Sequence, residues 1–361
     1  MVPIRLDVTS ERGPYPVLIG AGVIDSIGAL LSEHGLGAHL AVVSCPPVWR
    51  LHGPAVAKSC GRVTPVLMAD GERAKTLLSV SRLYETFAKR GVDRSTTVIA
   101  VGGGVVGDVA GFAAASYLRG LRLVQVPTTL LAQVDSAIGG KVGVNLTSGK
   151  NLVGAFHAPS LVVCDSRVLS TLPRREFRSG LYEVVKYGVI ASRPLFDRVA
   201  GALAPIFTRA DDVIAPLVAE CCRIKARVVM DDEREAGPRR ILNFGHTVGH
   251  ALEAITKYRR FRHGEAIGYG MLAAGALGVA RGAFLQADLA ALKDVIGHMG
   301  PLPPVTDLRI SEALEAVVHD KKVVNGRLHF VLPTGIGSTA IVSDVHTREL
   351  RAAMKAIGMR A

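Results

Sequence analysis

Three histidines and one glutamate have residue types that could hold a metal ion. His246 and His250 are four residues apart, so a helix would place both imidazoles on one face. His263 follows soon after, and Glu183 could add a carboxylate from a separate helix. Imidazoles completed by a carboxylate are a typical zinc donor set. Spacing alone nominates His246 and His250 as the ligand pair, although two histidines at this spacing are more often polar residues of a packed interior.

A glycine cluster follows a strand-like segment. The apolar residues 97–101 run directly into Gly102–Asp108, which contains four glycines, and a helix-like segment comes next. Glycines at a strand-to-helix turn let backbone N–H groups approach a pyrophosphate, and the helix N-terminus favours its negative charge. The same cluster could be a tight turn packed with small residues. It is also not the GxGxxG fingerprint that follows the first strand of a Rossmann domain.

Basic residues recur beside glycine and small polar residues. Grouped in one cleft, they could hold a phosphate and a carboxylate through charge-assisted hydrogen bonds. Taken singly, each is more often a solvated surface charge. The residues concerned are Arg119, Lys141, Lys150, Lys186, Lys225, Arg239 and Lys321.

The composition narrows the class of protein. The 361 residues carry a formal net charge of +12, but Lys and Arg are spread along the chain rather than gathered in a tail or an arginine-rich run. This pattern argues against nucleic-acid binding and favours a small anionic substrate, with a non-enzymatic basic binding module as the weaker alternative. Five cysteines without a CxxC pair predict neither a disulfide framework nor a thiolate zinc site. They favour a reducing cytoplasm.

Two apolar stretches, 98–118 and 266–280, could be mistaken for membrane spans. The first contains Asp108 and several glycines, and the second is shorter than the ~20 residues that a bilayer requires. We therefore expect no transmembrane segment. The first ten residues alternate apolar and polar types as a strand does, and they lack the features of a signal peptide.

The pattern of predicted helices and strands, which must position these residues, changes near residue 171. Before it, strand-like segments alternate with helix-like ones, which predicts a parallel α/β sheet with strands at 40–44, 63–68, 97–101, 121–127 and 161–165. After it, one late strand is expected at 328–332. The remaining pattern is helical, at 174–192, 211–229, 245–256, 265–281, 285–299 and 311–321. We expect two domains, 1–171 and 172–361.

Taken in order, the motifs resemble those of the 3-dehydroquinate synthases. The matching segments run from Asp70 to Lys322 and cover most of the chain: 70–75, 102–108, 117–120, 127–136, 139–141, 149–151, 183–186, 243–250, 263–265 and 320–322. The resemblance implies an α/β plus α fold, with an N-terminal parallel-sheet NAD-binding domain and a C-terminal, mainly helical metal- and substrate-binding domain. It also implies a homodimer.

The resemblance assigns residues to each role. It implies Glu183, His246 and His263 as ligands of Zn²⁺ or Co²⁺, and it moves His250 from ligand to substrate contact. The implied NAD-binding residues are Glu72, Lys75, Gly103, Gly104, Val105, Asp108, Thr128, Thr129, Leu131, Lys141 and Lys150. The implied catalytic residues are Arg119, Lys141, Asn151, Lys186, Lys225 and His250, and further substrate contacts are Asp135, Lys150, Arg239, Asn243 and Lys321.

The implied reaction converts 3-deoxy-D-arabino-heptulosonate 7-phosphate to 3-dehydroquinate and phosphate. In such enzymes NAD transiently oxidises a secondary alcohol, phosphate is eliminated, the hydride returns, the ring opens and an intramolecular aldol step closes the carbocycle. The alternatives are another sugar phosphate cyclase and a metal-dependent alcohol or glycerol dehydrogenase of the same fold. One departure is visible: Ser44-Cys45-Pro46-Pro47 stands where the family often has an acidic or amide residue near the adenosine ribose.

Overall fold

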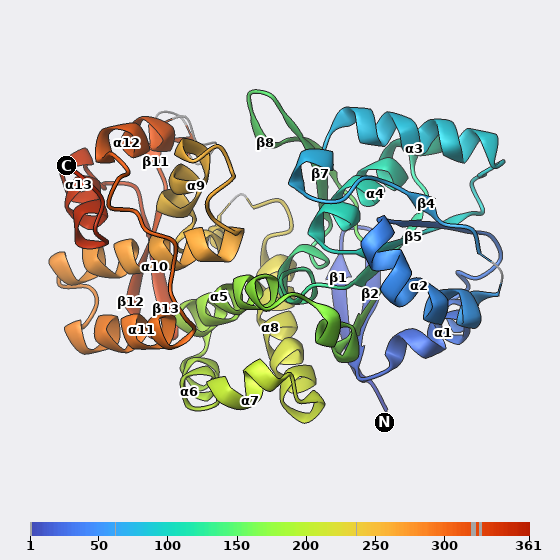
Figure 1. Ribbon diagram of the computed structural model, residues 1–361, viewed down its shortest axis with the longest axis horizontal. Coiled ribbons are helices and arrows are strands. Elements are labelled where there is room, and N and C mark those ends of the chain that lie inside the picture. Colours follow the sequence, from blue (N-terminus) through green and yellow to red (C-terminus); the bar gives the residue numbers. More distant parts are fainter. Residues whose placement is uncertain (1, 62, 236, 319–322, 325–326) are drawn as a thin grey trace. The chain divides into compact units, whose positions relative to one another are not determined.

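A seven-stranded sheet organises the first part of the chain (Figure 1). The computed structural model describes residues 2–61, 63–235, 237–318, 323–324 and 327–361. The strand order is β1-β2-β9-β6-β5-β3-β4, with β1 antiparallel to β2 and the other pairs parallel. The bounds are β1 Ile4–Ser10, β2 Gly13–Gly20, β3 Leu40–Ser44, β4 Val66–Leu67, β5 Thr97–Gly102, β6 Arg122–Pro127 and β9 Leu161–Asp165.

The chain reverses its direction across this sheet between β3 and β5. From β3 it moves outward to β4, whereas β5, β6 and β9 extend the sheet on the other side of β3. Ligands of open α/β sheets bind beyond the carboxyl ends of the strands at such a switch point. The glycine cluster follows β5 directly, so the topology places it at the switch point.

Helices cover the sheet and complete its core. The apolar side chains of α3 and α4 pack with those of β5 in one cluster that includes the fully buried Phe87, Val98 and Val109. The helices of this part are α1 Ile27–Glu33, α2 Pro46–Cys60, α3 Leu77–Lys89 and α4 Gly104–Ser116.

A long helix from later in the chain also belongs to this part. Contacts divide the chain into Met1–Pro173 with Arg209–Arg234, and Arg174–Thr208 with Glu235–Ala361. The helix α8, Asp211–Asp231, packs on β1 and β2, and its side chains Leu217 and Cys221 are fully buried. The sequence pattern had placed α8 in a continuous second domain, because helical periodicity does not tell which sheet or helix a segment packs on.

A β-hairpin interrupts the α/β alternation, and the sequence pattern did not predict it. Strands β7, Lys141–Leu146, and β8, Gly149–Phe156, pair antiparallel in a separate small sheet. Gly143 and Gly154 are directly paired, and a Cβ on Gly154 would lie 2.2 Å from the Val142 carbonyl oxygen. Glycines at a close backbone approach weaken the residue pattern by which strands are found.

The second unit is built around α10. This helix packs against α5, α9, α11, α13 and β12, which explains why it is apolar on nearly every side. The helices are α5 Arg174–Ala191, α6 Arg193–Gly201, α7 Leu203–Thr208, α9 His246–Ile255, α10 His263–Ala280, α11 Gln286–His298, α12 Ile310–Val318 and α13 Thr347–Ala356. Among the described residues, every helix is too short or too polar to traverse a bilayer.

The second unit contains more strand than the sequence pattern predicted. One late strand was expected at 328–332, whereas β12 Phe330–Gly335 pairs with β13 Ser338–Val342, and β10 Val323–Val324 pairs with β11 Arg327–Leu328. Strand β13 is only partly buried. Its sequence therefore need not contain the continuous apolar run by which a buried strand is recognised. The expectation of a parallel-sheet part followed by a mainly helical part is confirmed.

Glycines set the distance between α9 and its neighbour α10. A Cβ at Gly270 would lie 1.7 Å from the Gly245 carbonyl oxygen. Gly270→Ala should therefore destabilise the chain by about 1–3 kcal/mol, because the helices must move apart. Gly297→Ala in α11 is the control, since nothing lies within 4 Å of its Cβ. Urea unfolding should show the control equal to or about 0.4–1 kcal/mol more stable than the original chain. A Gly270→Ala variant of unchanged stability would contradict this account.

Candidate functional site

Glu183, His246 and His263 come together in the second unit. Glu183 lies on α5, whereas His246 and His263 are the first residues of α9 and α10. Each residue offers one ligand atom, and the three atoms lie within 4.8 Å of one another. Oε1 of Glu183 is 3.7 Å from Nε2 of His246 and 3.6 Å from Nε2 of His263. Both imidazoles therefore present the same ring nitrogen to a fully buried carboxylate.

This arrangement fits a zinc-type ion. With metal–ligand bonds of about 2.0–2.2 Å, donor atoms in a tetrahedral site lie about 3.3–3.6 Å apart. The separations of 3.6 and 3.7 Å are close to that range. Two neutral imidazoles and one carboxylate would leave a fourth position for water or substrate, as catalytic zinc sites do.

The other ring nitrogen of each histidine also has a partner. Nδ1 of His246 lies 3.0 Å from the Phe244 carbonyl oxygen, and Nδ1 of His263 lies 3.3 Å from Oε2 of Glu253. Burial disfavours the imidazolium of His263, but Glu253 and Glu183 outweigh it and raise its pKa to about 9. A metal ion binding at His263 must therefore displace a proton.

His250 lies beside this trio and has a different neighbour. Its ring centroid is 5.3 Å from that of His246 and 6.0 Å from that of His263. Its possible ligand atom groups with those of Glu253 and His263, not with Glu183. The pair nominated by spacing alone is thus not the pair that meets Glu183, because α10 begins beside the start of α9.

Three further predicted residues of the second unit are fixed in place by contacts or by burial. Lys186 is one helical turn after Glu183, is almost fully buried, and forms an ion pair with Oε2 of that glutamate. Arg239 is also buried, and Asn243 donates from Nδ2 to Oε1 of Glu235 at 2.6 Å. Lys321 lies outside the described residues.

In the first unit, the glycine turn meets the segment that follows β6. Because β5 and β6 are parallel neighbours, their carboxyl ends lie side by side, and the Thr128 N–H donates to the Gly102 carbonyl oxygen at 2.9 Å. A Cβ on Gly103 would lie 3.0 Å from Cγ2 of Thr129. The N-terminus of α4 starts here, with Gly104 and Val105 in its first turn. Leu131 follows at the start of the π-helical turn Ala132–Ser136. The turn can accept a phosphate group.

A group of charged residues lies beside this turn. The nearly buried Lys75 pairs with Asp108 of α4. Burial lowers the pKa of Lys75, but Asp108 and Glu72 outweigh it and leave the pKa above its usual value. Glu72 accepts from Nδ2 of Asn145 at 2.8 Å and lies 3.7 Å from Nζ of Lys150. The structure thus brings Glu72, Lys75, Asp108 and Lys150 into one network.

The remaining predicted residues of this unit occupy the hairpin and α8. Lys225 of α8 is buried and donates to Oδ1 of Asp135 at 2.6 Å. Lys141 begins β7 with an exposed side chain. Asn151 has a left-handed backbone, with φ +54°, and its N–H donates to Oδ1 of Asn145 at 2.9 Å.

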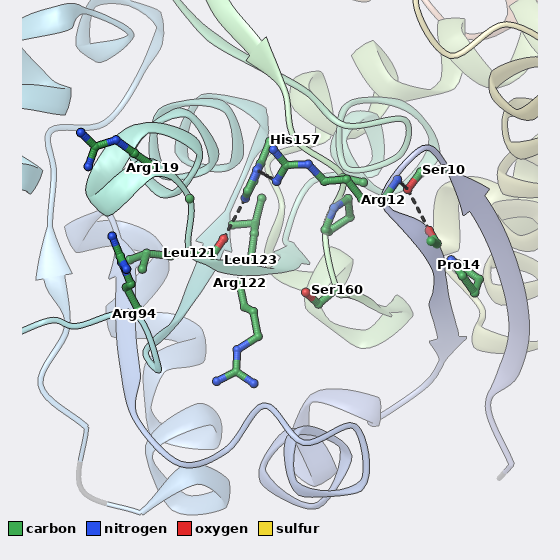
Figure 2. A pocket seen from close by; sticks show the side chains of 14 residues that line it. Ser10, Arg12, Pro14, Arg94, Arg119, Leu121, Arg122, Leu123, His157 and Ser160 are labelled. Carbon is green, nitrogen blue, oxygen red and sulfur yellow. Dashed lines mark hydrogen bonds between the residues drawn. The ribbon is translucent and has the colours of Figure 1, made fainter.

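Arg119 lies elsewhere, in a hollow lined by arginines (Figure 2). The hollow has a volume of about 780 Å³ and lies by the amino ends of the parallel strands. Helix α4 separates Arg119 from the glycine turn of the same chain by 13 residues, or about 20 Å. The lining includes the side chains of Arg12, Arg94, Arg119, Arg122 and His157, and Arg12 contacts Nδ1 of His157 at 2.7 Å. Within one chain, the structure does not join Arg119 to the glycine turn.

The segment that departs from the family pattern follows β3, at the switch point. Ser44 donates from its hydroxyl to the Val101 carbonyl oxygen at 2.8 Å. Cys45 is buried at the start of α2, and burial raises the pKa of its thiol to about 11. Burial and the raised pKa both disfavour the reactive thiolate form of Cys45.

The fold places this chain with the sugar phosphate cyclases. A solved 2-deoxy-scyllo-inosose synthase in complex with carbaglucose-6-phosphate, NAD⁺ and Co²⁺ has a TM-score of 0.88 and 27% identity, covering 98% of this chain and 99% of that one. A 2-epi-5-epi-valiolone synthase from Streptomyces hygroscopicus, with NAD⁺ and Zn²⁺ bound, has a TM-score of 0.87 and 29% identity, covering 95% and 96%. A probable glycerol dehydrogenase from Sinorhizobium meliloti, 16% identical with a TM-score of 0.65, shares the fold alone and covers 99% and 98%.

The chain belongs to the 3-dehydroquinate synthase family. Residues 65–179 match the model of the family's N-terminal domain, and residues 180–323 match that of its C-terminal domain. The 3-dehydroquinate synthase of Pelotomaculum thermopropionicum is 45% identical over 93% of this chain and 92% of its own. That of Solibacter usitatus is 44% identical over 95% and 96%.

The geometry of the trio yields a test. His263→Ala removes one of the three donors, so we expect loss of tightly bound Zn²⁺, measured by elemental analysis after dialysis. His298→Ala is the control, because His298 is an exposed histidine of α11 in the same unit. Full metal occupancy in His263→Ala would exclude His263 as a ligand.

Proposed function

We propose that this chain converts 3-deoxy-D-arabino-heptulosonate 7-phosphate to 3-dehydroquinate and phosphate, as a phosphate-eliminating carbon–oxygen lyase. The observation that carries the proposal is the meeting of Glu183, His246 and His263. It occurs in a chain 45% identical to a 3-dehydroquinate synthase over nearly its full length. The reaction would serve the shikimate pathway and aromatic amino-acid biosynthesis.

The cofactors would be NAD and one divalent ion, Zn²⁺ or Co²⁺. Bound NAD would supply a hydride acceptor for a secondary alcohol of the substrate, and the ion a Lewis acid for the alcohol oxygen. The glycine turn, Thr128, Thr129 and Leu131 would hold the dinucleotide, with Glu72, Lys75, Asp108 and Lys150 beside it. Similarity to the two cyclase structures that contain NAD⁺ and Co²⁺ or Zn²⁺ supports this choice.

The basic residues would bind and orient the anionic substrate. Lys186 is held beside Glu183 by a buried ion pair, so its ammonium group is fixed next to the metal ligands. Preorganised charge of this kind stabilises developing negative charge without reorganisation. The residues proposed to contact phosphate, carboxylate or hydroxyl groups are Arg119, Asp135, Lys141, Lys150, Asn151, Lys186, Lys225, Arg239, Asn243, His250 and Lys321.

The proposal also includes an oligomeric state and a cellular location. A homodimer is proposed from the resemblance to the family. A cytoplasmic location is supported by the cysteines, since all five are free thiols and four of them are buried.

The first test follows phosphate and nicotinamide together. With this substrate and catalytic NAD, we expect phosphate release that a chelator abolishes and Zn²⁺ or Co²⁺ restores, with no net gain of absorbance at the NADH band. Hydride transfer and its reversal within one turnover require that absence. Phosphate release from a sugar phosphate lacking the carboxylate would instead indicate a sister cyclase. Stoichiometric NADH from a simple alcohol would indicate a dehydrogenase.

A second test addresses Lys141. A charge-assisted contact to phosphate is worth about 1.5–3 kcal/mol, so Lys141→Ala should lower kcat/KM by about 10- to 100-fold. Although the resemblance also counts Lys141 among the NAD-binding residues, NAD should remain bound, and its affinity, followed by fluorescence titration, should change far less than kcat/KM. Lys89→Ala removes an exposed lysine of α3 and serves as the matched control. An unchanged kcat/KM in Lys141→Ala would remove this residue from the site.

A further inference from the structure

One buried carboxylate lies beside Glu183, His246 and His263, which we call the metal-type trio. The proposed reaction gives this carboxylate no role. Glu253 lies on α9, three residues after His250 and seven after His246, so all three occupy one face of the helix. It is 3% exposed, and its Oε2 lies 3.3 Å from Nδ1 of His263 on α10. A buried charge costs several kcal/mol unless it is paired, so its position calls for a physical reason.

The geometry of His263 gives that reason. Its Nε2 is directed to Oε1 of Glu183, at 3.6 Å, and its Nδ1 to Glu253. An imidazole that binds a metal through Nε2 carries its proton on Nδ1. A carboxylate that accepts this proton fixes the tautomer and the ring plane, and it makes the metal-binding nitrogen more basic.

The two histidines of the trio differ in this respect. Nδ1 of His246 contacts a neutral acceptor, the Phe244 carbonyl oxygen, at 3.0 Å. Nδ1 of His263 contacts a charged one. Glu253 thus brings a second negative charge close to the proposed metal, and it would make His263 the stronger of the two imidazole donors.

A competing arrangement uses the same residues. His250, Glu253 and His263 also offer ligand atoms within 4.8 Å of one another, so this group could in principle bind its own ion. Because His263 belongs to both groups, a second ion would have to occupy its Nδ1. The two arrangements therefore predict different numbers of bound ions and different positions of the proton on His263.

We propose that Glu253 is a positioning residue of the metal site, which orients His263 through Nδ1 and strengthens it as a ligand. This inference rests on the proposed function of Glu183, His246 and His263 as metal ligands. Glu253 does not itself bind the ion.

The test is Glu253→Gln in the full chain, which keeps the side-chain volume and removes the charge. We expect Zn²⁺ affinity to fall by about 10- to 100-fold in competition with a chromogenic chelator. The visible absorption spectrum of the Co²⁺-loaded chain should also change, because the ligand field of His263 weakens. Glu349→Gln is the matched control, since Glu349 is an ion-paired carboxylate of α13 in the same unit and should leave both readouts unchanged.

Comparison with Glu183→Gln separates the possible failures. If Glu183→Gln loses Zn²⁺ and Glu253→Gln binds it with full affinity, the positioning role is wrong. If neither variant loses affinity, the proposed metal site is itself wrong. Two ions per chain, one of them lost in Glu253→Gln, would make Glu253 a ligand and overturn the proposal.

A spectroscopic measurement on the unchanged chain covers the case in which Glu253→Gln does not fold. With Zn²⁺ bound, nitrogen NMR of His263 should show the proton on Nδ1 and the metal on Nε2. The reverse assignment would overturn the proposal.

Discussion

Direct backbone contact among α5, α9 and α10 determines where the metal-type trio forms. A Cβ on Gly264 would lie 1.9 Å from the Ser179 carbonyl oxygen of α5, and one on Gly270 would lie 1.7 Å from the Gly245 carbonyl oxygen. Gly264 follows His263 directly, Gly245 precedes His246, and Ser179 is one turn before Glu183. Each close contact is thus adjacent to a donor residue. Larger side chains at these positions would separate the helices and the three donors with them.

In the first unit, backbone hydrogen bonds between strands position the candidate residues. There, parallel pairing of β5 with β6 brings Gly102 opposite Pro127, so the glycine turn and the Thr128–Thr129 segment must lie together. The chain reversal between β3 and β5 makes the carboxyl ends of these strands the place where open α/β sheets usually bind ligands. Hydrogen bonds of the sheet determine where these two segments lie, and the segments themselves supply the groups that could bind a ligand.

Local periodicity predicted the bounds of helices and strands well, but it did not predict which distant segments they pack on. The strands at 40–44 and 161–165 have the predicted bounds, α5 ends one residue earlier than predicted, and α11 is shorter than predicted by one residue at each end. The domain of α8 and the pairing of His246 with His263 depend on contacts between distant segments, which no local period contains. The motifs that resemble the family nominated the three residues that the fold brings together, because they carry information about long-range contacts. The roles of the substrate residues remain predictions, and Lys321 lies outside the described residues.

The net positive charge of the chain does not by itself describe the charge of the candidate sites. Lys75, Lys186 and Lys225 are nearly buried, and each forms an ion pair with a neighbouring carboxylate: Asp108, Glu183 and Asp135 respectively. For Lys75, burial lowers the pKa of the ammonium group, but the neighbouring carboxylates Asp108 and Glu72 outweigh it and leave the pKa above its usual value. Pairing also fixes the side chain, which removes the entropy that a long, free lysine would lose on binding a ligand. The exposed Lys141 lacks that burial, and it would contribute to attraction of an anion more than to its exact placement. The net charge of +12 therefore describes the surface, whereas recognition would depend on a few buried ion pairs that the fold holds in position.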